Sequence, residues 1–266
     1  MANYKIHILV CGGTGCKSSE SDMIAHYLRS ELTQHGLSDE VQVVMSGCFG
    51  FCEKGPIVKV MPDNIFYVSV KPTDAKAIVE EHIIKGRTVE HLLYNDPITG
   101  QKITESRKMD FYQQQYRIAL RNCGFIDPEN IEEYIGRDGY AALGKVLTAM
   151  TPDQVIAEIK ASGLRGRGGA GFPTGVKWEL MAKVPITPKY VICNADEGDP
   201  GAFMNRAVLE GDPHRMIEGM IIGAYAMGAS QGYIYIRAEY PLAIKRLEIA
   251  IAQAHQYGLL GANLFG

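Results

Sequence analysis

The chain has 266 residues, of which 46% are hydrophobic and 21% charged, and its 27 basic and 30 acidic side chains give a formal charge of −3. This composition is typical of a folded protein of about two domains, and it argues against nucleic-acid binding driven by bulk positive charge. The longest apolar stretches, such as 220–227, are shorter than the roughly 20 residues that a membrane span needs, so we expect no span. The N-terminus lacks the pattern of a secretory signal, and we expect a cytoplasmic protein.

The first 86 residues have the pattern of a small α/β domain. Alternating apolar residues indicate strands, apolar residues at helical spacing indicate helices, and Gly36 and Gly86 are typical helix ends. The expected elements are a strand at 5–10, a helix at 19–35, a strand at 41–46, a hairpin of strands at 57–60 and 65–70, and a helix at 73–84. The strands at 5–10 and 41–46 each run into a loop that contains two cysteines.

Residues 87–110 are polar and irregular, so we expect a linker there and a second domain at 111–266. In that domain we expect helical pieces over 112–150, a capped helix from Thr151 to Ser162, a helix after a glycine loop, a strand at 190–193, a helix from 213, a strand at 232–236 and a helix at 241–257. This alternation predicts a doubly wound, largely parallel sheet. Because residues 258–266 add no closing element, we expect the domain to be truncated.

Four of the six cysteines form two pairs in glycine-containing loops near the N-terminus. Four residues separate Cys11 from Cys16, and three separate Cys48 from Cys52. In a reducing compartment such a group indicates a metal site more often than disulfides. Zinc knuckles prefer two intervening residues, whereas the wider spacing suits an iron–sulfur rhomb, so we expect a [2Fe-2S] cluster. Four reduced thiols or a structural zinc ion are the alternatives.

Three other residues with reactive side chains are interpreted as structural. Cys123 falls in a predicted helix and Cys193 in a predicted strand, where a lone cysteine is usually a small apolar filler. His214 follows Pro213 and is interpreted as a residue of a helix start, not as an acid or base.

The segment 163–178 is rich in glycine and carries two arginines and a lysine. Glycine lets the main chain approach an anion, the following helix offers free amides, and the cations add charge-assisted bonds, so the segment predicts phosphate binding. It matches neither the P-loop nor the dinucleotide fingerprint directly after a strand, and a flexible linker is the alternative. Phe172 either stacks on a flat ring or packs in the core. The candidate residues are Gly166, Arg167, Gly168, Gly169, Gly171, Phe172, Gly175 and Lys177.

An acidic loop follows the strand predicted at 190–193. Its candidate residues are Asn194, Asp196, Glu197 and Asp199. Ligands of open α/β sheets sit beyond the carboxyl ends of strands, and these side chains can accept hydrogen bonds from ring imides and ribose hydroxyls. The loop therefore predicts contacts to a flavin or nicotinamide nucleotide, with a solvated turn as the alternative.

These two motifs resemble a known family. The runs 166–175 (GRGGAGFPTG) with Lys177 and Trp178, and 194–201 (NADEGDPG), are similar to the flavoprotein subunit that oxidises NADH in respiratory complex I. The family includes the NAD(P)-linked β-subunits of electron-bifurcating [FeFe] hydrogenases and formate dehydrogenases. The hydrogenase-type members also carry an N-terminal thioredoxin-like [2Fe-2S] domain, whose ligands Cys11, Cys16, Cys48 and Cys52 resemble. The resemblance therefore implies a thioredoxin-like ferredoxin domain followed by a Rossmann-like parallel α/β domain.

The resemblance also implies roles for single residues. The positions that match the FMN site of the family are Gly168, Gly169, Lys177, Asn194, Asp196 and Glu197. Phe172 matches the aromatic residue that stacks on the nicotinamide nucleotide. Asp199 stands where the family often has a glutamate that contacts the dinucleotide, which leaves the preference between NADH and NADPH open. Hydride transfer needs no side-chain acid or base, so no catalytic residue is expected.

The family continues beyond the motifs matched here, with a Gly-Glu-Glu-Thr segment and a [4Fe-4S] domain. Neither occurs in the 266 residues, and we expect this chain to be the N-terminal portion of a longer subunit. The implied cofactors are FMN, NAD(P)H and [2Fe-2S]. The implied partners are a small thioredoxin-like [2Fe-2S] subunit and an iron–sulfur catalytic subunit of a hydrogenase or formate dehydrogenase.

Three functional hypotheses follow. The first is a subunit that transfers a hydride between NAD(P)H and FMN and passes single electrons to or from iron–sulfur clusters. The second is a non-catalytic electron-relay and assembly module without a complete flavin site. The third is a zinc-dependent binding domain, which would contain stoichiometric zinc and no visible colour.

Overall fold

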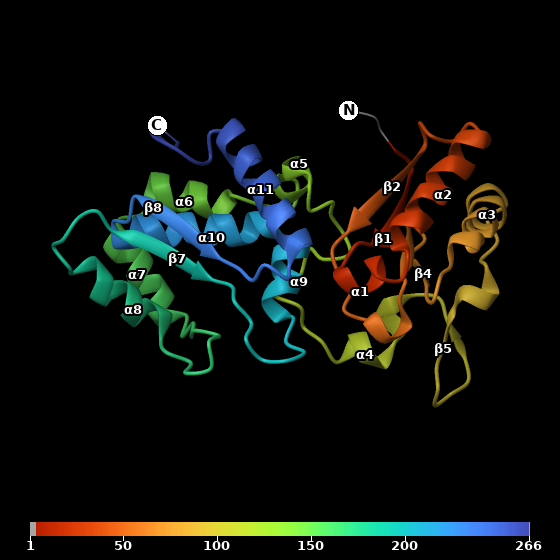
Figure 1. Cartoon of the computed structure of the whole chain (residues 1–266), viewed down its shortest axis with the longest axis horizontal. Coiled ribbons are helices and arrows are strands. Elements are labelled where there is room, and N and C mark those ends of the chain that lie inside the picture. Colours follow the sequence, from red (N-terminus) through yellow and green to blue (C-terminus); the bar gives the residue numbers. More distant parts are fainter. Residues whose placement is uncertain (1–3, 266) are drawn as a thin grey trace. The chain divides into compact units, whose positions relative to one another are not determined.

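The structure is a computed structural model that describes residues 4–265 (Figure 1). Internal contacts divide these residues into two compact units. Unit 1 contains the described residues up to Pro128 together with Glu210–Asp212. Unit 2 contains Glu129–Leu209 and the described residues from Pro213 onward.

Unit 1 is built on a four-stranded mixed sheet with the order β2-β1-β3-β4. Its strands are β1 (Ile6–Cys11), β2 (Val41–Ser46), β3 (Val58–Met61) and β4 (Ile65–Tyr67). Strand β1 pairs in parallel with β2 and antiparallel with β3, and β3 and β4 form the expected hairpin. Cys11 lies opposite Ser46 in the parallel pair, so the two cysteine loops leave the sheet at the same end.

Alternating residues of β1 supply the two faces of this sheet. Ile8 and Val10 are fully buried in a cluster that includes residues of helix α2 (Ser21–Gln34), while Leu9 and Cys11 belong to a second cluster with Phe49 and other aromatic residues. The helix predicted at 19–35 and the strand predicted at 41–46 are therefore confirmed. The predicted α/β class is also confirmed for this part of the chain.

The remaining elements of unit 1 are short. They are α1 (Thr14–Lys17), α3 (Ala75–Ala77), a π-helix at Ile78–Ile84, β5 (Tyr94–Asn95), β6 (Lys102–Ile103) and α4 (Asp110–Gln113). The helix predicted at 73–84 is thus divided into a 3-10 turn at Pro72–Asp74, α3 and the π-helix. The internal contacts of unit 1 extend past the segment 87–110, where Leu92 and Met109 are buried, and the domain boundaries at 86 and 110 stay a prediction.

Unit 2 consists of helices around a two-stranded parallel sheet. The helices are α5 (Ile131–Ile135), α6 (Ala141–Ala149), α7 (Pro152–Ala161), α8 (Thr174–Ala182), α9 (Met204–Gly211, whose last two residues are grouped with unit 1), α10 (Pro213–Met227) and α11 (Pro241–Gln256). Strands β7 (Tyr190–Asn194) and β8 (Gln231–Tyr235) pair in parallel, as predicted. Cys193 and Ile234 pack into an apolar cluster on one face of the pair.

The start of α7 shows how closely local sequence determines an element. The Thr151 hydroxyl accepts a hydrogen bond from the Gln154 amide at 3.3 Å, and the Gln154 side chain accepts one from the Thr151 amide at 2.9 Å. This is the capping box that the sequence predicts. The helix ends at Ala161, and Gly163 follows with a φ of +67° that favours glycine.

Two expectations for the helices are wrong. Cys123 lies in turns at 121–125 and not in a helix, because Gly124 takes a φ of +82° that interrupts helical geometry. Helix α9 is an element that the sequence pattern does not predict. Its N-terminal amides are bound by Glu197, a residue several positions upstream, so the local pattern of 204–211 does not reveal the start.

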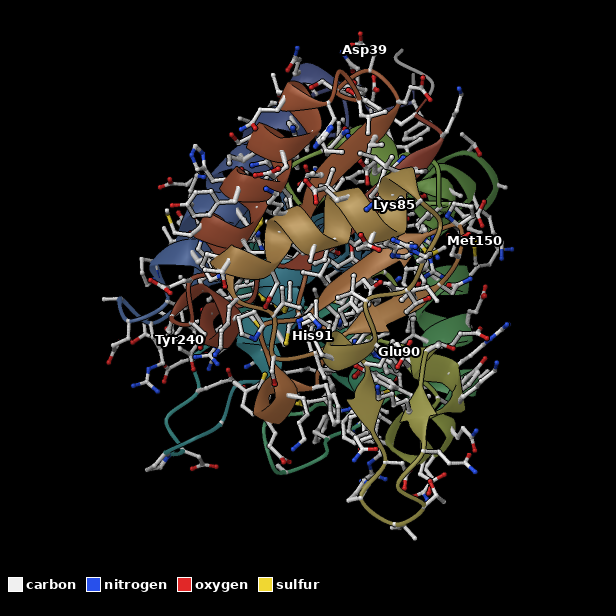
Figure 2. The ribbon with its side chains drawn as sticks, turned by 90° about the vertical axis from the view of Figure 1, so that its right-hand side faces the viewer. Asp39, Lys85, Glu90, His91, Met150 and Tyr240 are labelled. Atoms are coloured by element: carbon white, nitrogen blue, oxygen red, sulfur yellow. The ribbon has the colours of Figure 1, made fainter. Side chains whose placement is uncertain are left out.

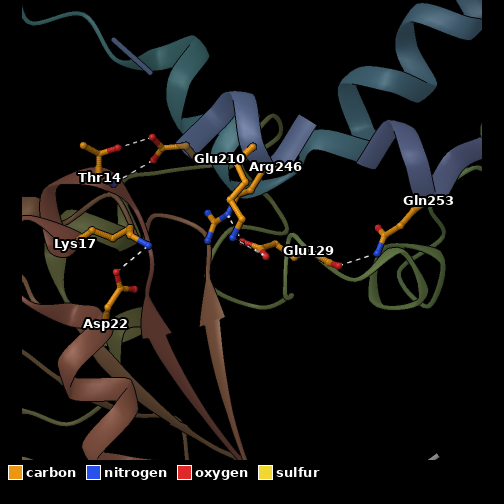
Figure 3. A network of polar contacts seen from close by, with 8 residues as sticks. Thr14, Lys17, Asp22, Glu129, Glu210, Arg246 and Gln253 are labelled. Atoms are coloured by element: carbon orange, nitrogen blue, oxygen red, sulfur yellow. Dashed lines mark hydrogen bonds and ion pairs between the residues drawn. The ribbon is translucent and has the colours of Figure 1, made fainter. Parts of the chain in front are cut away.

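A buried polar network lies in unit 2 around His214, which is in the first turn of α10 as predicted. The Tyr140 hydroxyl lies 2.9 Å from Nδ1 of His214, and the Gln253 side-chain oxygen lies 3.0 Å from Nε2. The Gln253 amide nitrogen donates to the carbonyl of Glu129 at 2.8 Å, which leaves its oxygen facing His214 (Figure 3). His214 therefore donates through Nε2 and accepts through Nδ1, as neutral imidazole does.

Among residues 4–265, no helix is both long enough and apolar enough to cross a bilayer.

Candidate functional site

The structure brings together all four cysteines selected from the sequence. The thiol of Cys11 forms hydrogen bonds with those of Cys16 and Cys48, and Sγ of Cys48 lies 3.8 Å from Sγ of Cys52. Cys11, Cys16 and Cys48 are buried, whereas Cys52 is exposed. The parallel pairing of β1 and β2 causes this convergence, because both loops begin at the same end of the sheet.

Glycines leave room for the sulfur atoms in these loops. A Cβ atom added to Gly55 would lie 2.8 Å from Sγ of Cys16, and one added to Gly13 would lie 2.9 Å from Cβ of Cys48. In addition, the amide of Gly50 donates to Sγ of Cys48 at 3.3 Å. Close main-chain approach and amide donors to sulfur suit an iron–sulfur cluster, so the residues present fit this group.

The four thiols influence one another's protonation. Hydrogen bonding with the Cys16 thiol raises the pKa of Cys11 to about 12, with burial adding to the effect. Hydrogen bonding with Cys11 raises the pKa of Cys48 to about 11, while the contact with Cys11 lowers the pKa of Cys16. Because metals bind the thiolate form, loading the site releases protons from Cys11 and Cys48.

The arrangement of the thiols differs from that of a site for a single metal ion. Within residues 4–265, no group of three or more His, Cys, Asp or Glu side chains is placed to hold one ion. The thiols instead form two close pairs, Cys11 with Cys16 and Cys48 with Cys52, which are joined through Cys11 and Cys48. A binuclear cluster takes two thiolates at each iron, so paired thiols suit it.

The glycine–arginine loop forms a narrow hairpin in unit 2. The Gly166 amide donates to the Phe172 carbonyl at 2.8 Å, and the Thr174 amide donates to the Leu164 carbonyl at 2.9 Å. Nε of Arg165 donates to the Gly171 carbonyl at 2.6 Å and thereby closes the loop. Gly169 and Gly171 adopt φ values of +91° and +60°, which explains the need for glycine at these two positions.

The tip of this hairpin is open to an anion. In the described part of the chain, the amides of Gly168, Gly169 and Ala170 make no hydrogen bond with protein. A Cβ added at Gly168 or Gly169 would meet nothing within 4 Å. Successive free amides beside arginine side chains are the arrangement that binds phosphate.

The other candidates of this segment have different surroundings. Phe172 is 49% exposed, so core packing does not account for it. Lys177 lies on the first turns of α8 and is only partly buried. Gly175 is buried, and its added Cβ would lie 2.6 Å from the backbone nitrogen of Lys160. The close packing of α7 against α8 thus explains Gly175 without a cofactor.

The acidic loop divides into exposed and occupied side chains. Asn194, Asp196 and Asp199 are exposed, and the Asn194 side chain accepts a hydrogen bond from the Asp196 amide at 3.1 Å. Glu197 is buried, and its carboxylate accepts bonds from the amides of Asn205 and Arg206 at 2.8 and 3.2 Å. In this structure Glu197 therefore acts as the cap of α9.

The two loops project from the same edge of unit 2 in both views (Figures 1 and 2). Among the described residues, no hydrogen bond or ion pair joins 163–172 to 194–199. A cavity of about 770 Å³ lies elsewhere in unit 2 and is lined by apolar residues that include Met220, Tyr225 and Ile234. None of the candidate residues lines it.

Sequence reasoning missed Gly13 and Gly55 as parts of the cysteine site. Gly13 lies between two of the cysteines, and Gly55 follows Cys52 closely in sequence. That proximity was an available signal, but only the structure shows that Gly55 faces Cys16 of the other loop.

Comparison with known families identifies both parts of the chain. Residues 2–82 match the thioredoxin-like [2Fe-2S] ferredoxin family, and residues 159–263 match the Nuo51 FMN-binding domain family. The candidate cysteines lie within the first match, and the glycine–arginine and acidic loops lie within the second.

Curated relatives agree with these matches. The chain is 64% identical, over 58% of its length, to 31% of the NADP-reducing hydrogenase subunit HndC of Solidesulfovibrio fructosivorans. It is 50% identical, over 56% of its length, to 35% of the "F 2" polypeptide of the NADH-quinone oxidoreductase of Rhizobium meliloti (strain 1021). The chain thus spans about a third of the length of these relatives.

Two solved structures match the chain in part. A thioredoxin-like [2Fe-2S] ferredoxin from Aquifex aeolicus matches with a TM-score of 0.32 and 29% identity, over 35% of this chain and 99% of the ferredoxin. An NAD⁺-reducing [NiFe]-hydrogenase in the H2-reduced state matches with a TM-score of 0.45 and 22% identity, over 97% of this chain and 41% of that one. On the family matches, the chain belongs at residues 2–82 to the thioredoxin-like [2Fe-2S] ferredoxins and at residues 159–263 to the Nuo51 FMN-binding domains.

Proposed function

We propose that this chain is part of an NAD(P)H-linked oxidoreductase subunit. FMN would supply the chemistry that links hydride transfer from or to NAD(P)H with single-electron transfer through iron–sulfur clusters. The observation that carries this proposal is the four-thiol site, whose sulfurs lie together in the same chain as an FMN-binding family match. The names of the relatives, one a hydrogenase and the other a quinone oxidoreductase, support the reaction class.

In this proposal the glycine–arginine loop binds the phosphate of FMN. The free amides of Gly168 and Gly169 face the phosphate, Gly166 and Gly171 shape the loop, and Arg167 and Lys177 supply positive charge. Phe172, with half of its surface exposed, stacks on the nicotinamide nucleotide.

The acidic loop orients the heterocycle. Asn194 and Asp196 are exposed beyond the carboxyl end of β7, where ligands of α/β sheets bind, and Asp199 contacts the dinucleotide. Glu197 takes part through the loop that it fixes to α9. These side chains bind and orient the reactants, and none is needed to move a proton at the hydride step.

Cys11, Cys16, Cys48 and Cys52 would hold the [2Fe-2S] cluster. The partners that we propose are a small thioredoxin-like [2Fe-2S] subunit and an iron–sulfur catalytic subunit, either a hydrogenase or a formate dehydrogenase. We also propose a cytoplasmic location.

Anaerobic reconstitution of the full-length protein with FMN, iron and sulfide, followed by rapid mixing with NADH or NADPH, tests this function. The flavin absorbance should bleach, and the reduced [2Fe-2S] signal should appear in electron paramagnetic resonance (EPR) spectra. A flavin-loaded protein that neither nucleotide reduces would contradict the proposal.

A second candidate is a non-catalytic electron-relay module. One observation favours it: the Glu197 carboxylate is occupied by two amides of α9, so one candidate flavin contact is already used. Measuring the flavin retained by the purified 266-residue chain separates the two functions. Stoichiometric retention supports the oxidoreductase, and iron–sulfur loading without flavin supports the relay.

A further inference from the structure

Three consecutive residues outside the N-terminal segment contact the cysteine loops. Glu210, Gly211 and Asp212 are grouped with unit 1 by their contacts, although about 80 residues of unit 2 precede them in the chain. Their relative exposures are low: 1% for Glu210 and 0% for Asp212, and Gly211 is also buried. Buried carboxylates are rare unless they are paired or hydrogen-bonded, so their placement calls for a reason.

Glu210 binds the loop between the first two cysteines. Its carboxylate accepts a hydrogen bond from the Thr14 amide at 3.1 Å and another from the Thr14 hydroxyl (Figure 3). Thr14 lies between Cys11 and Cys16, so these two bonds fix the path that the main chain takes between the two sulfurs.

Gly211 and Asp212 contact the neighbouring segments. A Cβ added to Gly47, the residue before Cys48, would lie 2.6 Å from Cα of Gly211. A Cβ added to Gly211 would lie 2.3 Å from Sγ of Cys123, which fills the space beside both glycines. The Asn122 side chain donates to Asp212 at 2.8 Å. The segment thus contacts both cysteine loops at once.

We propose that Glu210 is a positioning residue of the [2Fe-2S] site and that its charge lowers the reduction potential of the cluster. This inference rests on the proposed function of the four cysteines. The two bonds to Thr14 hold the Cys11–Cys16 loop in the conformation that receives the metal.

The expected direction of the potential follows from electrostatics. Reduction adds one electron, and therefore one negative charge, to the cluster and its thiolates. A carboxylate held beside the ligand loop and shielded from water opposes that added charge more strongly than an exposed one. Net charge and hydrogen bonding near the sulfurs are among the factors that set iron–sulfur potentials.

The test is a redox titration of the reconstituted protein with dithionite, followed by the EPR signal of the reduced cluster. Glu210→Gln keeps the shape of the side chain and removes its charge, and its midpoint potential should be higher than that of the unmodified protein. Asp39→Asn is the matched control. It removes the same charge from an exposed residue that precedes β2, at the end of that strand opposite to Gly47 and Cys48 (Figure 2), and its potential should not change.

Equal potentials for Glu210→Gln and Asp39→Asn would overturn the charge effect. Thr14→Val provides a second measurement if Glu210→Gln does not fold, because it removes one hydrogen bond without altering charge. Its cluster should be lost several-fold faster to a chelator, measured as decay of visible absorbance, and an unchanged rate would overturn the positioning role. Failure of the unmodified protein to take up iron and sulfide would instead contradict the proposed function.

Discussion

At the scale of single residues, the space around the sulfurs depends on glycine. Gly55 has a φ of −69°, which alanine also adopts, so Gly55→Ala introduces mainly the 2.8 Å contact between the new Cβ and Sγ of Cys16. We expect this variant to retain markedly less iron and sulfide after reconstitution, measured by metal analysis. Gly15→Ala is the control in the same site, because its Cβ would lie 3.9 Å from Sγ of Cys52, an ordinary contact. Equal loading of both variants would count against this geometry.

Gly168 and Gly175 separate a binding role from a packing role. Gly168→Ala adds a methyl group in open space, so the stability should not change, but the methyl group should obstruct the phosphate. We expect FMN affinity to fall about tenfold, equivalent to about 1.4 kcal/mol, in a fluorescence titration of the full-length protein. Gly175→Ala forces a Cβ against the Lys160 backbone and should cost about 1–3 kcal/mol of stability. A Gly168→Ala variant with unchanged FMN affinity would exclude this amide cradle.

The sequence identified the reactive residues better than their surroundings. Spacing and glycine content were sufficient to select the four cysteines, whose sulfurs the structure brings together. The contacts of Gly55 with Cys16 and of Glu210 with Thr14 join residues distant in sequence, and no local pattern predicts them.

At the scale of elements, α9 depends on Glu197. Glu197→Ala removes the acceptor of two N-terminal amides and should destabilise α9 by about 1–2 kcal/mol. Hydrogen exchange at the amides of Asn205 and Arg206 should become faster. Asp199→Ala, in the exposed part of the same loop, should leave exchange at both amides unchanged. If Glu197→Ala also left it unchanged, the capping role would be wrong.

The elements that the sequence predicted well are those whose signals are local. The strands at 41–46 and 190–194 and the capping box of α7 follow from β-rich residues and from Thr151 and Gln154. The helix expected around Cys123 failed because a left-handed glycine overrides the apolar spacing. Helix α9 was missed because its cap comes from a neighbouring loop.

At the scale of whole units, His214 makes the stability of unit 2 depend on pH. Burial lowers the pKa of His214 below its ordinary value of 6.5, and the hydrogen bond with Gln253 opposes this only in part. As the pH falls below 6.5, the unfolded chain takes up a proton that the folded unit does not, so folding becomes less favourable until the lowered pKa is reached. Unit 2 should therefore unfold at a lower urea concentration at about pH 5.5 than at about pH 7.5.

Trp178 is the single tryptophan and lies in unit 2, so its fluorescence reports the unfolding of that unit. The control variant His214→Gln removes the titrating group and should reduce the difference between the two pH values. If the variant showed the same pH dependence as the unmodified chain, His214 would not be its source.

The central claim for the molecule as a whole is that one polypeptide binds FMN through the glycine–arginine loop and a [2Fe-2S] cluster through four cysteines. The most direct measurement is an anaerobic titration of the reconstituted full-length protein with NADH and with NADPH, recorded by visible absorbance and EPR together. We predict that at least one nucleotide bleaches the flavin and produces the reduced-cluster signal, and that Cys48→Ser removes or alters that signal while flavin bleaching persists. A loaded protein whose flavin and cluster both stay oxidised with either nucleotide would contradict the account.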